Sequence, residues 1–264
     1  MEDPLLPIHN STTSDVVDGT SAAAFSTTKI LLRLSAVVAI AAVSLWANYE
    51  ASKGFELSIV NAAGVDSHAG RRFDLMFVSN GEADRIVYRA SQFVENALYP
   101  DESYPRKPVG RVKLHFAGRD LDTVVDVIAG SDVGDFVIYL SPSLMSAPNA
   151  ATALAAAMHR GVARVWLWNG RGTAPGEVID AMVEYLAVAA GFPPTLKTVG
   201  CDVTCWSEGL LRDCESRRSG FVAELNRGMR ERWTEDATDG ELGSAARRAC
   251  EALTTQRMES NHAE

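Results

Sequence analysis

An apolar segment near the N-terminus constrains this chain more than any other feature of its sequence. It runs from Ile30 to Ala47 and is interrupted by one charged residue, Arg33. A helix that crosses a bilayer needs about 20 mostly apolar residues, with a lower limit near 17. Trp46 and Tyr49 lie at the far end, where amphipathic rings favour the membrane interface. The segment therefore predicts a transmembrane signal-anchor helix over residues 30–47.

The charges around this segment predict its orientation. Lys29 and Arg33 lie on its N-terminal side. The C-terminal side carries a net negative charge from Glu50, Lys53 and Glu56. Basic flanks stay in the cytosol. We therefore expect a single-pass type II membrane protein of the endomembrane system or plasma membrane, with a lumenal or extracellular C-terminal domain.

Residues 1–28 predict a disordered cytosolic tail. They are rich in serine, threonine and alanine, and their charged residues are all acidic. Such a composition cannot bury a core, and it lacks the arginines of an organellar presequence. The sequon Asn10-Ser11-Thr12 lies in this tail, so we expect it to remain unglycosylated.

Net charge and cysteine content exclude some classes of function. A formal charge of −9 does not suit nucleic-acid binding, which needs a basic face to neutralise phosphates. The four cysteines lie in the last quarter of the chain: Cys201, Cys205, Cys214 and Cys250. They fit two disulfides, with three possible pairings. A zinc site is the alternative, but the C-x-x-x-C pair lacks a C-x-x-C or histidine partner nearby.

Residues 55–255 read as one α/β domain, and residues 256–264 as a flexible C-terminus. Alternating apolar residues predict a half-buried strand over Val109–Phe116 and a strand pair over Val124–Ile128 and Phe136–Leu140. Residues 73–78 fit either a strand or a helix lead-in. Helical spacing and capping signals predict helices over residues 82–98, 149–168, 175–191, 207–233 and 239–255.

The run Trp166-Leu167-Trp168-Asn169-Gly170 is similar to the segment that follows the zinc-binding helix in the plant basic secretory protein family. Residues 184–192 resemble that family's second helix with its Ala-Gly-aromatic end, and residues 219–229 resemble its C-terminal helix. The resemblance spans roughly residues 55–250. It implies an α/β (α+β), zincin-like domain with a small mixed sheet and several long helices, here preceded by the predicted transmembrane helix.

In that family an H-E-x-x-H motif precedes the tryptophan run. Its two histidines share one helix face and hold zinc, and its glutamate activates the metal-bound water. The corresponding residues here are Arg160, Gly161 and Arg164. A guanidinium group does not deprotonate in a protein, so it cannot bind zinc, and glycine has no side chain to act as a base. The resemblance therefore implies a zincin-like pseudopeptidase without catalytic residues, metal or cofactor.

The family's downstream acidic pair is matched by Asp180 and Glu184, one helical turn apart on one face. We expect these carboxylates to form salt bridges with Arg160 and Arg164. His159 precedes the first motif position by one residue, so it points about 100° away from the ligand direction. We expect it to be a partly buried or capping histidine.

Two functions follow as expectations. The first is binding or scaffolding in the endomembrane lumen or apoplast, with the family's link to plant defence implied by resemblance alone. The former active-site cleft could then hold a peptide or an anionic ligand, because arginine forks suit carboxylates and phosphates. The alternative is a zinc metallopeptidase with displaced ligands, His159 with Asp180 or Glu184. Asp120-Leu121-Asp122 matches the D-x-D of Golgi glycosyltransferases, but we interpret it as a solvated loop.

Overall fold

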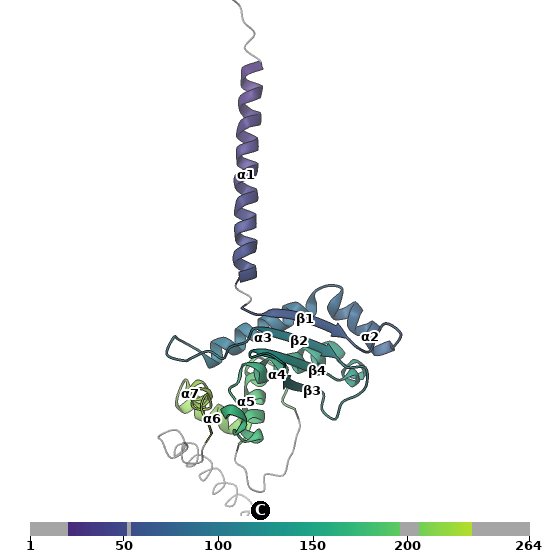
Figure 1. Cartoon of the computed structure of the whole chain (residues 1–264), viewed down its shortest axis with the longest axis vertical. Helices are drawn as coiled ribbons and strands as arrows, with labels where there is room; N and C mark the ends of the chain where they lie inside the picture. The colour runs from purple at the N-terminus through teal and green to yellow at the C-terminus, as the bar shows by residue number, and fades with distance from the viewer. Residues whose placement is uncertain (1–20, 52–53, 196–205, 234–264) are drawn as a thin grey trace, which may run out of the picture. The chain divides into compact units, whose positions relative to one another are not determined.

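The structure is a computed structural model that describes residues 21–51, 54–195 and 206–233. Within residues 21–51, it describes the side chains of residues 29–45. Contacts divide the chain into two units, residues 1–53 and 54–264, which are considered separately (Figure 1). The predicted helix over residues 239–255 and three of the four cysteines lie outside the described residues.

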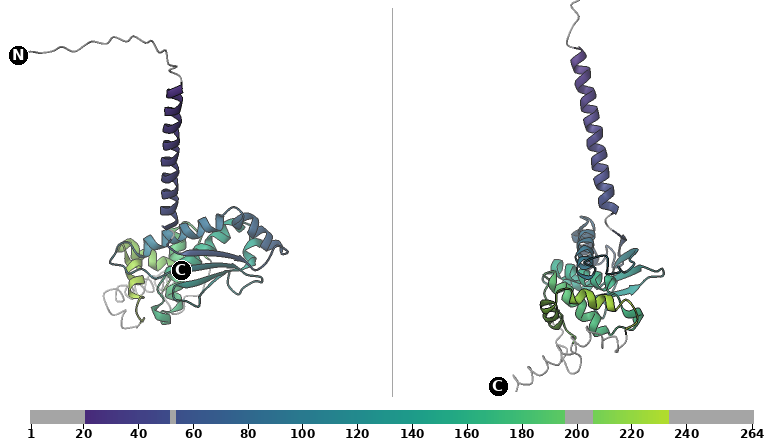
Figure 2. Two further views of the ribbon diagram at one scale, coloured as in Figure 1. Left: turned by 45° about the horizontal axis from the view of Figure 1, so that its top comes forward. Right: turned by 90° about the vertical axis from the view of Figure 1, so that its left-hand side faces the viewer.

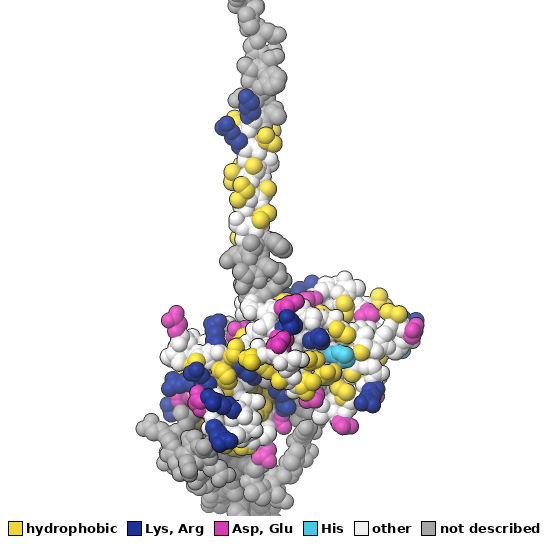
Figure 3. All heavy atoms as spheres, viewed as in Figure 1, with side chains coloured by type: hydrophobic (Ala, Val, Ile, Leu, Met, Phe, Trp, Pro, Cys, Tyr) yellow, Lys and Arg dark blue, Asp and Glu magenta, His cyan; other side chains and the backbone are white. Residues whose placement is uncertain are grey.

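The first unit contains the helix α1, Ser21–Ala51. It includes the predicted apolar segment, but it begins at Ser21, within the stretch expected to be a disordered tail. Residues 22–24 are alanines, which have the highest helix propensity. Among its described side chains, basic ones gather toward one end and hydrophobic ones follow (Figure 3). Judged on the described residues, no helix of this structure combines the length and apolar character needed to cross a membrane.

A four-stranded mixed sheet organises the second unit, as the resemblance implies. Its strands are β1 (Glu56–Asn61), β2 (Arg111–Phe116), β3 (Val125–Ala129) and β4 (Asp135–Leu140). Their order is β1-β2-β4-β3. Strands β1, β2 and β4 run parallel, and β3 pairs with β4 antiparallel as an edge strand. The half-buried strand and the strand pair are confirmed, whereas β1 was not predicted.

Two long helices cover one face of the sheet (Figures 1 and 2). Helix α3 spans Glu82–Leu98, and helix α4 spans Ala150–Trp166. The two pack against each other, and α4 also contacts β3 and β4. Alternate residues of β2, namely Val112, Leu114 and Phe116, are buried. The same alternation that predicted a strand therefore supplies the apolar layer beneath the helices.

The remaining described elements connect this two-layer core. They are α2 (His68–Phe73), a π-helical turn η1 (Asp74–Val78), two short 3-10 turns η2 (Pro142–Ser146) and η3 (Gly170–Gly172), α5 (Gly176–Ala189), α6 (Glu208–Arg217) and α7 (Phe221–Gly228). Residues 73–78 are thus helical, which decides between the two predicted alternatives. Helix α5 packs on both α4 and α6.

The single helix predicted over residues 207–233 is wrong, because the chain forms α6 and α7 there. The break lies at Gly220, whose φ of 85° is a left-handed conformation that interrupts a right-handed helix. The Glu215 carboxylate accepts hydrogen bonds from the backbone N–H groups of Gly220 (2.7 Å) and Val222 (2.9 Å). It thereby caps the start of α7 in place of a Ser or Asp N-cap.

Candidate functional site

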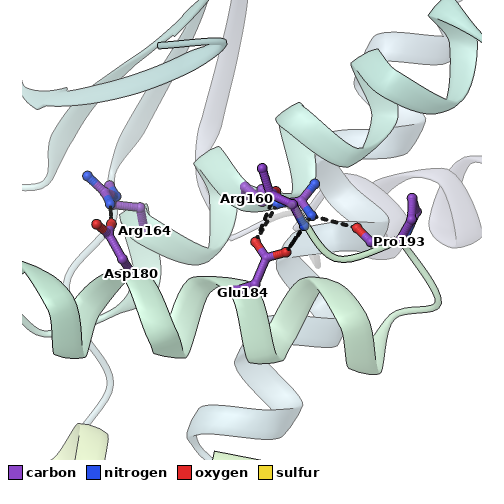
Figure 4. Close-up of polar contacts among 6 residues, drawn as sticks. Arg160, Arg164, Asp180, Glu184 and Pro193 are labelled. Atoms are coloured by element: carbon purple, nitrogen blue, oxygen red, sulfur yellow. Dashed lines mark hydrogen bonds and ion pairs between the residues drawn. The ribbon is translucent and has the colours of Figure 1, made fainter. Parts of the chain in front are cut away.

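Arg160 and Arg164 lie on α4 and point toward α5 (Figure 4). Arg160 and Arg164 are one turn apart on α4, and Glu184 and Asp180 are one turn apart on α5. Each arginine forms an ion pair with one carboxylate, Arg160 with Glu184 and Arg164 with Asp180. The predicted salt bridges are therefore confirmed.

The Arg160–Glu184 pair is bidentate and largely buried. Arg160 donates from Nε to Glu184 Oε2 (2.9 Å) and from Nη2 to Glu184 Oε1 (3.0 Å). The side chains are only 12% and 20% exposed. Nη2 also donates to the Pro193 carbonyl at 2.8 Å (Figure 4). Parallel N–H···O bonds of this kind are among the strongest in proteins, and they hold one edge of the guanidinium against Glu184.

Glu184 has a second set of donors. The backbone N–H and the hydroxyl of Thr195 both donate to its carboxylate. Burial raises the pKa of Glu184, but the hydrogen bonds from Arg160 and Thr195 and the charge of Arg160 outweigh burial and hold that pKa below its ordinary value. The carboxylate is therefore ionised and already occupied at neutral pH.

The second pair is much more open to solvent. The side chains of Arg164 and Asp180 are 37% and 60% exposed, and Arg164 Nη2 donates to Asp180 Oδ1. Solvent-exposed ion pairs contribute about 0.2–1 kcal/mol to stability. The two pairs thus share the same chemistry and the same helices, but differ in burial.

Gly161, between the two arginines on α4, faces the sheet. A Cβ placed on it would lie 2.6 Å from Ile138 Cγ2 on β4 and 3.3 Å from Val125 Cγ2 on β3. Such distances are below van der Waals contact, so only glycine allows α4 to approach the sheet this closely. The space for a glutamate side chain is filled by packing.

His159 is buried between two aromatic rings rather than directed at the carboxylates. Its ring lies 5.5 Å from that of Phe93 and 5.3 Å from that of Phe192, and neither nitrogen has a hydrogen-bond partner in the described structure. Burial and the charge of Arg160 lower its pKa to about 4. Of the two expectations, burial is confirmed and a capping role is wrong, because His159 lies inside α4.

The residues at this site do not fit a zinc ion. Arg160 and Arg164 present permanently charged guanidinium groups, and Gly161 presents no side chain. The carboxylates that could serve as ligands are bound to those guanidiniums. In the described parts of the chain, His, Cys, Asp and Glu side chains form no group of three able to hold a metal.

The tryptophan run after α4 forms a network that sequence reasoning did not foresee. Trp166 is buried, and its Nε1 donates to Ser91 Oγ on α3 at 2.6 Å. Its carbonyl accepts a hydrogen bond from the Tyr99 hydroxyl at 2.7 Å. Burial is the main reason that the pKa of Tyr99 rises to about 12. The hydroxyl is therefore a constant donor at any physiological pH.

Two further side chains bind the backbone of the same run. Lys107 Nζ donates to the Leu167 carbonyl at 2.6 Å, and the Trp168 N–H donates to Asn226 Oδ1 at 3.0 Å. Burial lowers the pKa of Lys107 to about 8. Asn226, on α7, is completely buried. The end of α4 is thus fixed by residues from three separate parts of the chain, which no local sequence pattern could reveal.

The other candidate residues stay apart from this site. Asp120 and Asp122 are exposed in a loop, as predicted. Cys214 is buried in α6 without a disulfide among the described residues. Its possible partners, Cys201, Cys205 and Cys250, lie outside the described residues, so the disulfides stay a prediction.

Comparison with known proteins identifies the family. The family model BSP, described as peptidase of plants and bacteria, matches residues 52–253. Searches of curated proteins and of solved structures give no match. Because the model covers most of the chain, including both ion pairs and the tryptophan run, this chain belongs to the BSP family of plant and bacterial peptidases.

Proposed function

We propose that this chain is a non-catalytic member of the BSP family, a pseudopeptidase with a binding or scaffolding role. The observation that carries the proposal is the buried, bidentate Arg160–Glu184 pair, which occupies the position of a zinc ligand. Gly161 adds to it, because the sheet fills the space that a general base would need.

Arg164 is the residue through which the former cleft would bind a peptide or an anionic ligand. Its pair with Asp180 is exposed, so a carboxylate from solvent can replace Asp180 at small cost. A ligand at Arg160 would have to displace Glu184 from a buried bidentate pair, which is far more costly. The proposed ligand site is therefore the exposed half of the cluster.

Metal analysis combined with a cleavage assay tests the loss of catalysis. The full chain, purified without chelators and incubated with Zn²⁺, should retain far less than one zinc per chain and should cleave no peptide in a chelator-sensitive manner. Stoichiometric zinc, or cleavage that a chelator abolishes, would overturn the proposal.

A matched variant shows that the assay can detect a site. Arg160→His with Arg164→His restores two histidines at i and i+4 and frees both carboxylates as ligands. This double variant should bind about one zinc per chain, yet cleave nothing, because Gly161 still supplies no base. If the variant binds zinc and the native chain does not, the two arginines account for the absence of zinc binding in the native chain.

We also propose that α1 anchors the protein in a membrane of the endomembrane system or at the cell surface, with the C-terminal unit lumenal or extracellular. Support comes from the apolar sequence between Ile30 and Ala47 and from Lys29 and Arg33 at its N-terminal side. The large apolar side chains described on α1 are all exposed, from Ile30 at 59% to Leu45 at 72%. Exposed apolar surface of this extent marks an interaction with lipid or protein.

A further inference from the structure

We propose that Arg160 and Glu184 form a clasp that holds residues 192–195 against α4 and α5. This inference rests on the proposed absence of zinc and goes beyond it, because it assigns a task to the residues that replaced the metal site. The held segment directly follows α5. Gly191 ends that helix with a φ of 90°, and the Phe192 N–H donates back to the Ala187 carbonyl, which turns the chain toward α4.

The contacts of the segment converge on the buried ion pair and its neighbour. Pro193 accepts a hydrogen bond from Arg160 Nη2 at 2.8 Å. Thr195 donates to Glu184 from both its backbone N–H and its hydroxyl, the latter at 3.3 Å. The ring of Phe192 lies 5.3 Å from that of His159. Three of the four residues are therefore held by side chains of α4 and α5.

The composition of the segment explains why it needs such a clasp. Pro193 and Pro194 have no backbone N–H and cannot extend a helix, so the segment has little means of fixing itself by backbone hydrogen bonds. A guanidinium offers five donors in a planar fork, and a carboxylate accepts about four hydrogen bonds. Arg160 can therefore bind Glu184 and Pro193 together, and Glu184 can bind Arg160 and Thr195 together.

The exposed pair on the same two helices supplies an internal comparison. Arg164 and Asp180 also form an ion pair, yet neither contributes a hydrogen bond to residues 192–195 among the described contacts. If the clasp depends on its particular geometry, changing Arg164 should leave the segment unaffected. If any positive charge on α4 were enough, the two arginines would behave alike.

Amide hydrogen exchange of the full chain tests the clasp. Because Pro193 and Pro194 carry no amide hydrogen, the Thr195 amide reports on the segment. Arg160 holds in place the Glu184 carboxylate that accepts the Thr195 N–H. In Arg160→Met the carboxylate loses these charge-assisted hydrogen bonds, so the Thr195 amide should exchange at least about tenfold faster than in the native chain. Arg160→Lys should give an intermediate rate, because a single ammonium cannot reach both acceptors in the same way. Arg164→Met is the matched control and should exchange at the native rate.

Amides of α3 serve as a reference for global unfolding in each sample. Faster exchange at Thr195 in Arg160→Met, with α3 unchanged and Arg164→Met native-like, supports the clasp. Three results would overturn it: no change in Arg160→Met, an equal change in Arg164→Met, or an equal acceleration in α3. Zinc content is measured on the same preparations. A native chain that binds zinc refutes the proposed function, whereas a zinc-free chain with an unchanged Thr195 amide refutes the clasp alone.

Discussion

Single residues on α4 show two different ways in which this helix packs against its neighbours. Arg160 and Arg164 form ion pairs with the neighbouring carboxylates of α5. Gly161 has no side chain, and Ile138 and Val125 fill the space where its Cβ would lie. Any side chain introduced at Gly161 therefore conflicts with the packing of α4 on the sheet.

Gly161→Ala should lower the free energy of unfolding by about 1–3 kcal/mol, the usual cost of overpacking a core. Its Cβ would lie 2.6 Å from Ile138 Cγ2. Gly209→Ala, in α6, is a matched control, because the nearest atom to its Cβ is 4.0 Å away. The free energy of unfolding of this control should rise by about 0.4–1 kcal/mol, because alanine reduces the entropy of the unfolded chain. Urea unfolding measures both, and equal effects at the two glycines would refute the close contact.

His159 should make the protein less stable as the pH falls. Its pKa is about 4 in the folded chain, against an ordinary value of 6.5. Between these values the unfolded chain binds more protons, so folding stability decreases as the pH drops through that window. A difference of this size corresponds to about 3 kcal/mol at most. Unfolding free energies measured between pH 7 and pH 4 should show this loss.

His159→Leu isolates the contribution of the histidine. Leucine keeps an apolar side chain between Phe93 and Phe192 but has no proton to bind, so the decrease between pH 6.5 and pH 4 should largely disappear. Glu184 also has a pKa below its ordinary value, so its contribution is lost at still lower pH and should persist in the variant. A slope that is identical in the two proteins would place the pH dependence elsewhere.

Among the elements, α4 shows how the tryptophan run contributes to the fold. Tyr99, at the end of α3, donates to the carbonyl of Trp166, and Asn226 on α7 accepts from the N–H of Trp168. Polar backbone groups buried at a helix end require such partners. Hydrogen bonding and packing thus explain the structural role of the run.

Tyr99→Phe should lower the free energy of unfolding by about 1–2 kcal/mol, because it leaves the buried Trp166 carbonyl without this donor and keeps the ring. Tyr139→Phe is the comparison, since Tyr139 is only half-buried on the sheet and water can replace its hydrogen bonds. Thermal unfolding of both variants measures the difference. Equal stability of the two would show that water satisfies the Trp166 carbonyl.

Periodic patterns in the sequence predicted most helices and strands, but they did not predict long-range contacts. Helix α3 and the strands β2 and β4 follow from apolar spacing, because one face of each is buried. Strand β1 was missed, since it is an edge strand whose residues are mostly half-exposed and do not alternate clearly. The break at Gly220 depends on a left-handed φ and a cap from Glu215, which spacing does not reveal.

The candidate site was likewise predictable where it depends on residue spacing and not where it depends on how the elements pack. The spacing of Arg160, Arg164, Asp180 and Glu184 on two helices was sufficient to predict the ion pairs. The contacts of Pro193 and Thr195 were not predictable, because they depend on how the chain turns after Gly191. The proximity of Gly161 to Ile138 likewise depends on the separation of a helix and a sheet, which sequence patterns do not specify.

At the scale of the whole molecule, the family match and the apolar segment occupy different parts of the chain. The match covers residues 52–253, and the segment Ile30–Ala47 precedes it. The proposed anchor therefore lies outside the part of the chain that the family model matches. It would confine any ligand-binding role to one side of a membrane, which makes topology the property to measure.

A new glycosylation sequon can report that topology. Ser131→Asn with Val133→Thr creates Asn-x-Thr in the turn between β3 and β4, where Val133 is 95% exposed. If the C-terminal unit is lumenal, the double variant synthesised with microsomes should gain an endoglycosidase-sensitive increase in mass. Ser131→Asn alone lacks a sequon and should run like the native chain, whose Asn10-Ser11-Thr12 lies on the cytosolic side. Glycosylation at Asn10, with none at the new sequon of the double variant, would contradict the proposed orientation. The N-terminal side, with its basic residues Lys29 and Arg33, would then be the translocated side, against the usual charge rule.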